Sequence, residues 1–424
     1  MKNLALVILV LFCEHSLAQI ASESNEKSLG SDSAARPLLA LKYYRTVQLD
    51  QLQELAKEDR TAELLYGCAS GDKVALDALE NHLESISGNT ATEELAEMVA
   101  TLHAERFEFR KAIDIATKYG VRSRLSAEWD AYVDFPKPTL EATTNVIELD
   151  YDGLRFPAKV GERNVQVVFD TGAPNIGIDL SLASQIVRSI ERQSVVPAFK
   201  LDFPVHPALL PELDLGPCTL KNLPANGGDV PEEQKANLER LRQVTGGAEV
   251  ILGLDPFLNF FEVVEFDYES KKIRLIIKAD ERQKTRSTEP NFIRAGGGKP
   301  AVRVQFGDKE TNLYVDTGAY GHQAPREFLD GASPSKIRRF EQPWGNFSER
   351  LVQIQWIRGP LLQSWVGDGN FGTDTQWGVQ GVLGNWRSGK MRIDLKNRRI
   401  DLTGYDYAKS NYGFEPISIE RIER

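Results

Sequence analysis

Cysteine is scarce in this chain, and its scarcity excludes a fold held together by many disulfide bonds. The 424 residues include 3 cysteines. One of them, Cys13, lies in an N-terminal apolar segment, which leaves Cys68 and Cys218 for the folded protein. Two cysteines far apart in a long chain cannot form a disulfide scaffold. We therefore expect two buried free thiols, and a single disulfide between Cys68 and Cys218 is the open alternative.

Histidine and positive charge are also in short supply. The chain has 5 histidines and a formal net charge of −10. The histidines beyond the N-terminal segment are His82, His103, His206 and His322. Their spacing matches no metal-binding pattern, so we predict no metal site, and we interpret His322 as a solvated loop residue. The acidic balance argues against nucleic acid and anionic membranes as partners.

Long apolar runs are confined to the N-terminus. A run from Leu4 to Phe12 follows Lys2 and precedes a small-x-small pattern that ends at Ala18. This arrangement is typical of a secretory signal peptide, and the run is too short to span a bilayer. We therefore predict a signal peptide over residues 1–18 and an exported protein, periplasmic or secreted, with no membrane insertion after cleavage. The short signal favours a bacterial periplasm.

What the chain does contain is the tetrapeptide Asp-Thr-Gly-Ala, twice. One copy begins at Asp170 and the other at Asp316, and each ends a short apolar run. Two chance copies have odds of roughly one in ten thousand. Each copy also follows a strand-turn-strand pattern and precedes an apolar-apolar-Gly triplet, which ends at Gly253 or Gly384. We therefore predict an internal repeat of one β-rich unit.

These motifs resemble those of the pepsin-like and retropepsin-like aspartic peptidases. More narrowly, the chain looks like a bacterial-type protein with two tandem retropepsin-like units, because the four matched motifs occur in the right order. The resemblance covers Asn145 to roughly Tyr405. It implies a mainly β fold in which two β-barrel lobes form the pepsin-like acid protease architecture, preceded here by an all-α domain of helical hairpins.

Two facing carboxylates carry the chemistry that this resemblance implies. Two carboxylates a few ångströms apart share one proton and titrate as a unit. The ionised member can activate a water, and the protonated member can donate to the developing oxyanion. We predict that Asp170 and Asp316 are this catalytic pair. The mechanism requires no metal, cofactor or covalent nucleophile.

The residues after each aspartate have supporting roles. The resemblance implies that Thr171 and Thr317 bond across the interface between the lobes and hold the aspartates in register. Gly172 and Gly318 let backbone and substrate approach the carboxylates closely. The next positions, alanines at 173 and 319, lack the hydroxyl found near these sites in acid-active pepsins. With fewer donors, the pKa values of the pair are lowered less than in acid-active pepsins. We therefore predict activity from mildly acidic to near-neutral pH.

A substrate-covering flap is the least well defined part of the pattern. In the first unit the candidate, residues 199–206, contains no glycine. In the second unit Trp344 precedes Gly345, which is a better hairpin tip. We therefore assign Trp344 to substrate binding. The alternative is a half-buried surface aromatic with no such role.

The rest of the sequence divides around the repeat. Leucines at helical spacing predict helical hairpins, weakly similar to tetratricopeptide-type repeats, that either dock a protein partner or form a cap with no partner of their own. A polar stretch that opens at Asp229 predicts an exposed helical insertion near the cleft. We predict a disordered linker over 19–36, a helical domain over 37–135, lobe 1 over 144–278, an inter-lobe linker over 279–298, lobe 2 over 299–405 and a polar tail over 406–424.

The function predicted from the sequence is that of an aspartic endopeptidase acting on a protein or peptide substrate. Each lobe supplies one aspartate, so a monomer should suffice for the active site. The alternative is a catalytically silent peptide-binding or scaffolding protein on the same fold, which recruits partners through its helical domain.

Overall fold

The structure is a computed structural model of the whole chain. The residues that it describes are 35–86, 90–124, 127–152, 155–173, 175–179, 182, 186–188, 194–198, 201–228, 247–280, 289–295, 298–319, 321–332, 336–340, 347–368, 373–374, 377–384, 388–409 and 418–421. The predicted signal peptide, almost all of the first linker, the insertion at 229–246 and Trp344 lie outside these residues.

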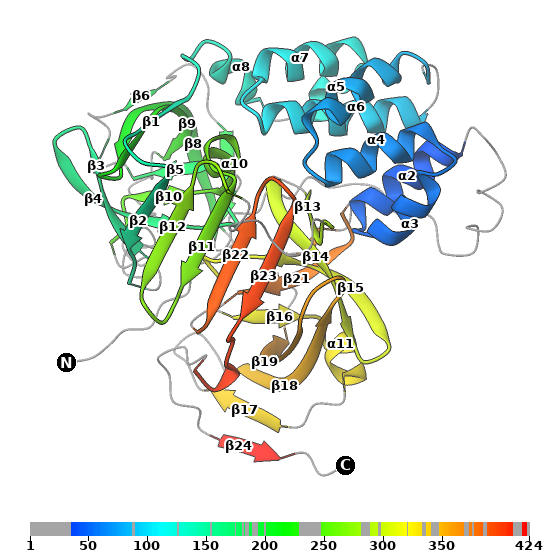
Figure 1. Cartoon of the computed structure of the whole chain (residues 1–424), viewed down its shortest axis with the longest axis vertical. Coiled ribbons are helices and arrows are strands. Elements are labelled where there is room, and N and C mark those ends of the chain that lie inside the picture. The colour runs from blue at the N-terminus through cyan, green and yellow to red at the C-terminus, as the bar shows by residue number, and fades with distance from the viewer. Residues whose placement is uncertain are drawn as a thin grey trace.

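The N-terminal part of the described chain is helical. Its helices are α2 (Arg36–Arg45), α3 (Leu49–Leu55), α4 (Arg60–Ala69), α5 (Lys73–Leu83), α6 (Thr90–Ala104), α7 (Phe109–Lys118) and α8 (Trp129–Tyr132), with a short 3-10 turn η2 (Arg122–Arg124). The side chains of Asp59 and Asp72 cap the first turns of α4 and α5, each accepting a backbone N–H at 2.9 Å. Figure 1 shows these helices gathered at the upper right of the view.

Lobe 1 is built on a closed six-stranded barrel. Its strands are β3 (Arg155–Val160), β4 (Arg163–Phe169), β5 (Ile176–Ile178), β8 (Leu201–Asp214), β9 (Cys218–Gly228) and β10 (Val250–Leu252). They pair in the order β9-β5-β10-β4-β3-β8, and β8 pairs with β9 to close the ring. Strands β1 (Thr139–Ala142), β6 (Val187–Arg188) and β7 (Ser194–Ala198) extend this sheet.

Lobe 2 repeats the same barrel. Its strands are β14 (Lys299–Phe306), β15 (Lys309–Val315), β16 (His322–Ala324), β18 (Phe347–Trp356), β19 (Leu361–Asp368) and β21 (Val379–Leu383). They pair in the order β19-β16-β21-β15-β14-β18, and β18 pairs with β19 to close the ring. Strands β13 (Phe292–Ala295), β17 (Lys336–Phe340), β20 (Thr373–Asp374) and β24 (Ser418–Arg421) and helix α11 (Arg326–Gly331) are added to it. In both rings the same two strand pairs are parallel, β4–β10 with β5–β9 and β15–β21 with β16–β19.

A 5-stranded sheet joins the two lobes. Its strands, in spatial order, are β2 (Val146–Asp150), β12 (Lys272–Ile276), β11 (Val263–Asp267), β22 (Lys390–Asp394) and β23 (Arg399–Thr403). The central pair, β11 and β22, runs antiparallel and comes from the two different lobes. Figure 1 shows this sheet in front of the barrels. Helix α10 (Leu254–Phe260) leads from β10 into β11, and a 3-10 turn η7 (Tyr407–Lys409) follows β23.

Two hydrophobic cores organise the molecule. One fills both barrels and the joining sheet. The other begins inside the helical domain, with Leu41 and Tyr44, and continues onto the outer face of lobe 2, where it includes Ile293, Tyr314 and Val382. The helical domain is therefore packed on lobe 2 by apolar burial rather than tethered beside it.

The prediction of a mainly β chain, with two barrels after a helical segment, is confirmed. Two details differ from the sequence analysis. Strand β13 lies within the stretch that we assigned to a flexible linker, and it pairs with β14. Strand β24 lies within the stretch that we assigned to a polar tail, and it pairs with β17.

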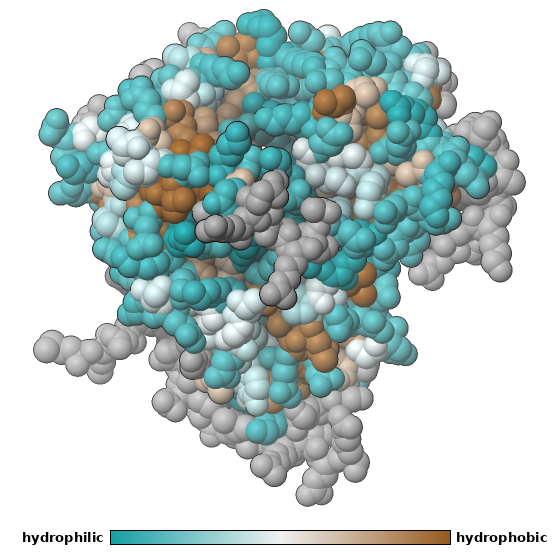
Figure 2. Space-filling model, viewed as in Figure 1, coloured by the Kyte–Doolittle hydropathy of each residue, from teal (hydrophilic) through white to brown (hydrophobic). Residues whose placement is uncertain are grey.

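The two cysteines and the surface agree with the composition. Cys68 and Cys218 are both buried and free, so the expected pair of buried thiols is confirmed. Figure 2 shows hydrophilic residues over most of one face, with apolar residues in separate patches. Among the described residues, the large apolar side chains that are mostly exposed are Val74 and Leu361. Within the same part of the chain, every helix is too short or too polar to cross a membrane.

Candidate functional site

The two Asp-Thr-Gly-Ala segments meet between the lobes. In lobe 1, β4 pairs in parallel with β10, and the N–H of Asp170 donates to the carbonyl of Leu252 at 3.0 Å. In lobe 2, β15 pairs with β21 in the same way, and the N–H of Asp316 donates to the carbonyl of Leu383 at 2.9 Å. Each apolar-apolar-Gly triplet therefore holds the backbone of one aspartate.

The threonines tie the two segments together reciprocally. The N–H of Thr171 donates to Oγ1 of Thr317 at 3.0 Å, and the N–H of Thr317 donates to Oγ1 of Thr171 at 2.9 Å. Each hydroxyl in turn donates to a strand carbonyl of the other lobe, Thr171 to Val315 at 2.7 Å and Thr317 to Phe169 at 2.9 Å. Both hydroxyls are buried and fully used, so the two loops are held in one relative position.

The glycines bring each carboxyl against the opposite loop. A Cβ placed on Gly318 would lie 2.7 Å from both carboxyl oxygens of Asp170. A Cβ placed on Gly172 would collide with the carboxyl of Asp316. Only the absence of a side chain at these two positions lets the aspartates approach each other this closely.

The carboxyl pair is almost completely buried, because the exposed fraction is 4% for Asp170 and 0% for Asp316. Burial, followed by the facing charge of Asp170, raises the pKa of Asp316 well above its ordinary value. Burial also raises the pKa of Asp170, while hydrogen bonds from Asp316 and from the N–H of Gly172 oppose the rise.

The hydrogen bonds around the pair distinguish three of its carboxyl oxygens. Oδ1 of Asp170 accepts the N–H of Gly172 at 2.8 Å. Oδ1 of Asp316 accepts the N–H groups of Gly318 and Ala319, at 2.7 and 2.9 Å. Oδ2 of Asp316 is buried and accepts no N–H or O–H bond from the described residues. A proton on this oxygen, directed at Asp170, satisfies both carboxyls, so we infer that the pair keeps one shared proton.

A buried lysine that the sequence analysis overlooked lies beside this pair. Lys299, the first residue of β14, is 4% exposed. Its Nζ lies 5.2 Å from the ring centroid of Tyr314. Tyr314 is a residue of β15 and comes two positions before Asp316 in the sequence. Strand pairing between β14 and β15 could have suggested this position, because both strands were expected from the sequence.

Both flap candidates fall on antiparallel hairpins. Strands β7 and β8 pair up to Ala198 and Leu201, at the start of the first candidate segment. Strands β17 and β18 pair up to Phe340 and Phe347, on either side of Trp344 in the sequence. Residues 199–200 and 341–346, and therefore the proposed contact of Trp344 with substrate, lie outside the described residues.

The interpretation of His322 as a solvated loop residue is wrong. His322 begins β16 and is 2% exposed. Its Nδ1 accepts the N–H of Gly384 at 3.1 Å, and its Nε2 lies 3.1 Å from the hydroxyl of Tyr405. Burial lowers the pKa of His322 to about 3. A neutral imidazole therefore supports the loop beneath Asp316, which polarity alone did not reveal.

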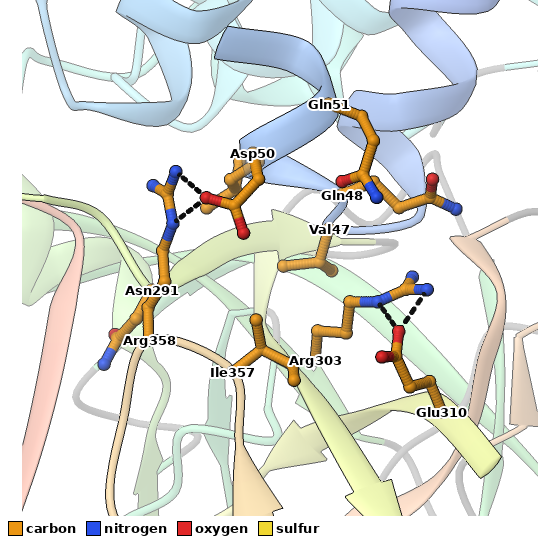
Figure 3. Close-up of a pocket in the computed structure, with 10 residues that line it drawn as sticks. Val47, Gln48, Asp50, Gln51, Asn291, Arg303, Glu310, Ile357 and Arg358 are labelled. Atoms are coloured by element: carbon orange, nitrogen blue, oxygen red, sulfur yellow. Dashed lines mark hydrogen bonds and ion pairs between the residues drawn. The ribbon is translucent and has the colours of Figure 1, made fainter. Parts of the chain in front are cut away.

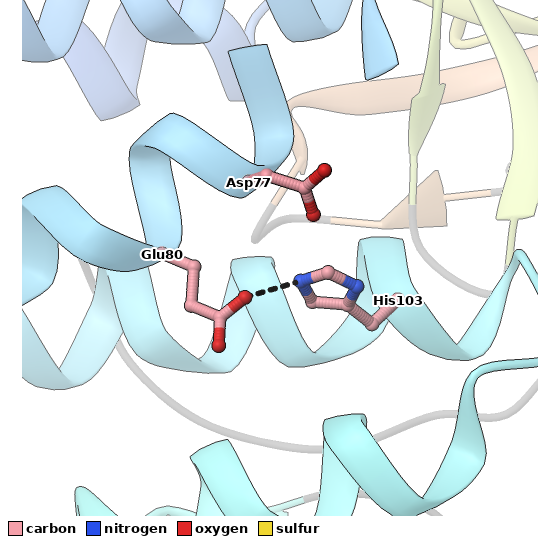
Figure 4. A group of neighbouring side chains, drawn as sticks. All are labelled: Asp77, Glu80 and His103. Carbon is pink, nitrogen blue, oxygen red and sulfur yellow. Dashed lines mark ion pairs between the residues drawn. The ribbon is translucent and has the colours of Figure 1, made fainter. Parts of the chain in front are cut away.

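One acidic cluster in the helical domain arises from residues distant in sequence. Asp77 and Glu80, one turn apart on α5, lie beside His103 of α6, with ligand atoms within 4.8 Å of one another (Figure 4). Nζ of Lys111 bonds both carboxylates, at 3.0 Å and 2.7 Å. A cation of the chain already occupies the cluster, and we assign no metal to it.

A polar cavity of about 90 Å³ lies between α3 and lobe 2 (Figure 3). Arg358 pairs with Asp50 across this gap, and Arg303 pairs with Glu310 at 2.7 Å. Because each of these arginines has a carboxylate partner, we interpret the cavity as part of the contact between the helical domain and lobe 2.

No protein-family model matches the chain, and a search of curated proteins finds no similar sequence.

Proposed function

We propose that this protein is an aspartic endopeptidase with Asp170 and Asp316 as its catalytic pair. The observation that supports this most directly is the reciprocal threonine bonding, which holds two carboxyls face to face at the ends of matching strands. A barrel needs no such arrangement for stability, because burying two carboxyls together is costly. The finer assignment, to tandem retropepsin-like lobes in a pepsin-like architecture, belongs to the same proposal.

The mechanism follows from the proton shared by the pair. Asp170, as the ionised member, takes a proton from a water held between the carboxyls as the water oxygen attacks the scissile carbonyl carbon. Asp316 donates its proton to the carbonyl oxygen, which gives a neutral tetrahedral diol. Asp170 then passes its proton to the leaving nitrogen, Asp316 regains one from the diol, and the C–N bond breaks. Both carboxyls return to their starting states.

The pH range in this proposal is mildly acidic to near neutral. Hydrogen bonds to the charged form lower a carboxyl pKa. The described N–H donors to the pair are backbone groups, and each of them bonds Oδ1 of Asp170 or of Asp316. Burial is the largest influence on both aspartates and raises the pKa of each. One chain carries both aspartates, so a monomer suffices. Export to a bacterial periplasm, proposed from the N-terminal segment, places substrate and enzyme outside the cytoplasm.

A peptide-binding or scaffolding protein without turnover is the second candidate. The near-complete burial of both carboxyls favours it, because a substrate must reach them. In this candidate the helical domain recruits a protein partner, and its exposed Val74 on α5 is one contact available for that purpose.

Peptide cleavage by the purified mature chain distinguishes the two candidates. We would incubate a diverse peptide mixture from about pH 3 to about pH 8, a range that spans ordinary carboxyl and histidine pKa values. Asp170→Asn and Asp316→Asn should each abolish cleavage. Asp394→Asn is the matched control, because Asp394 is equally buried but lies on β22. Cleavage that survives either dyad substitution refutes the mechanism, and a wild type that cleaves nothing favours the silent candidate.

A further inference from the structure

Strand pairing brings a lysine to the end of the ladder where one aspartate of the pair lies. In the β14–β15 ladder the last facing residues are Ala301 and Tyr314. Lys299 precedes Ala301 by two residues and Asp316 follows Tyr314 by two, so both lie beyond this last pair, at the same end of the ladder. Nζ of Lys299 lies 5.2 Å from the ring centroid of Tyr314, so the lysine side chain turns toward β15.

The charge of Lys299 reaches both aspartates. Burial raises the pKa of each carboxyl, and the Lys299 ammonium opposes that rise at each of them. It is the described cation with the largest electrostatic effect on either group. A buried ammonium in a site of low dielectric acts more strongly than a surface lysine at the same distance.

The two lobes differ at this position. In the sequence, Gly153 stands at the same spacing before Asp170 as Lys299 stands before Asp316. The sequence therefore has an aspartate in each lobe but a lysine at this spacing in lobe 2 alone.

Other ionisable groups near Lys299 are matched or neutral. Arg294 on β13 donates to the carbonyl of Gly298 at 2.9 Å and pairs with Asp255 of α10, so these two charges offset each other. Burial keeps the hydroxyls of Tyr44 and Tyr314 protonated by raising the pKa of each. Glu105 pairs with Arg294 and is also subject to the charge of the buried Arg398, and His322 is neutral.

We propose that Lys299 is a positioning residue that supplies a fixed positive charge to the Asp170–Asp316 pair and holds it in its singly ionised state. This inference rests on the proposed function for its role in catalysis. The physical claim, that the lysine and the carboxyl pair are coupled, can be measured without any substrate.

The first experiment measures thermal unfolding against pH for Lys299→Met, in the wild type and in the Asp170→Asn/Asp316→Asn background. The folded pair binds protons that unfolded aspartates release, so stability falls as pH rises through the range where the folded pair titrates. Loss of the ammonium should move that fall toward higher pH by about one unit. The double-Asn background should show no such movement.

Matched variants keep this experiment decisive. Lys159→Met removes an exposed lysine from β3, the counterpart strand in lobe 1, and should leave the pH dependence unchanged. Lys299→Arg keeps the charge and should resemble the wild type in pH dependence. If Lys299→Met does not fold, we would measure the pH dependence of unfolding in Lys299→Gln and compare it with that in Lys299→Arg. A change that is equal in both backgrounds overturns the proposal, because it shows a packing role only.

The second experiment measures peptide cleavage against pH. Both limbs of the profile should move toward higher pH in Lys299→Met and stay in place in Lys159→Met. An unmoved profile in an active Lys299→Met enzyme also overturns the proposal. If the wild type itself cleaves nothing, the proposed function fails, yet the unfolding experiment still decides whether Lys299 and the pair are coupled.

Discussion

The two lobes share one strand order but have different surroundings. Each barrel delivers an aspartate by the same parallel pair of strands, and each loop makes the same threonine bonds. Lobe 2, however, is covered on its outer face by the helical domain and brings Lys299 to the pair. The shared strand order thus fixes where the carboxyls lie, whereas Lys299, which lobe 2 alone contributes, makes their electrostatic environment unequal.

The helical domain also fixes the relation between the lobes. Arg294 of lobe 2 pairs with Glu105 of the helical domain at 2.9 Å and with Asp255 of lobe 1. Asn259 of α10 donates to the carbonyl of Glu105 at 2.8 Å, and the hydroxyl of Tyr132 donates to Oδ1 of Asn226 in lobe 1 at 2.8 Å. Each of the three regions therefore contributes a charge to one buried junction.

Removing the charge at the centre of this junction should have the largest effect on stability. Arg294→Met removes the one side chain that pairs directly with both Glu105 and Asp255, which costs about 4 kcal/mol of unfolding free energy at neutral pH. Chemical denaturation measures the loss. Asp50→Ala is the control, because it breaks a pair between the same two regions in which Asp50 is 64% exposed. That pair should contribute less than about 1 kcal/mol, and comparable losses in the two variants would contradict the idea of a buried brace.

The next largest effect tests whether the lobes are equivalent at the threonines. Thr171→Val and Thr317→Val each delete a buried hydroxyl that makes two bonds, and each leaves a carbonyl and an N–H without a partner. We expect about 3 kcal/mol of destabilisation from either change, with a parallel loss of peptide cleavage.

Thr311→Val is a matched control for the threonine pair. Thr311 is also buried, but its bond to Gln380 is 3.4 Å long, so its loss should cost less than about 1 kcal/mol. If the destabilisation in Thr171→Val and that in Thr317→Val differ by more than the destabilisation in Thr311→Val, the reciprocal bonds are not energetically symmetric. The two lobes would then not be equivalent at the threonines.

The sequence predicts the local parts of the site and misses the parts made by distant pairing. The Asp-Thr-Gly-Ala loops and their supporting triplets are contiguous motifs, so Asp170 and Asp316 could be identified by inspection. Lys299 follows a glycine run that indicates a linker, and only the pairing of β14 with β15 brings it to the end of the ladder where Asp316 lies. Glu105 and Arg294 lie in separate domains, and no local pattern relates them. Polar residues near loops, such as His322, were assigned to solvent because burial is a property of the packed fold.

The smallest expected effect concerns the pH dependence contributed by the junction. Burial, opposed by Arg294, raises the pKa of Asp255 to about 7, whereas an unfolded aspartate titrates near about 4. The folded state therefore binds the extra proton between these values, and stability falls as pH rises through that window. Asp255→Asn cannot titrate, so its melting temperature should decline less across the window than that of the wild type.

Asp267→Asn separates this effect from the general consequences of replacing an aspartate. Although burial opposes it, bonds from Lys390 and Ser270 lower the pKa of Asp267 to about 2, so this group stays ionised throughout the window and its replacement should leave the slope unchanged. An unchanged slope in Asp255→Asn as well would show that Arg294 keeps Asp255 ionised at all these pH values. The titration across the window would then belong to other groups, and the pair between Arg294 and Asp255 would hold the lobes at every pH where the catalytic pair can act.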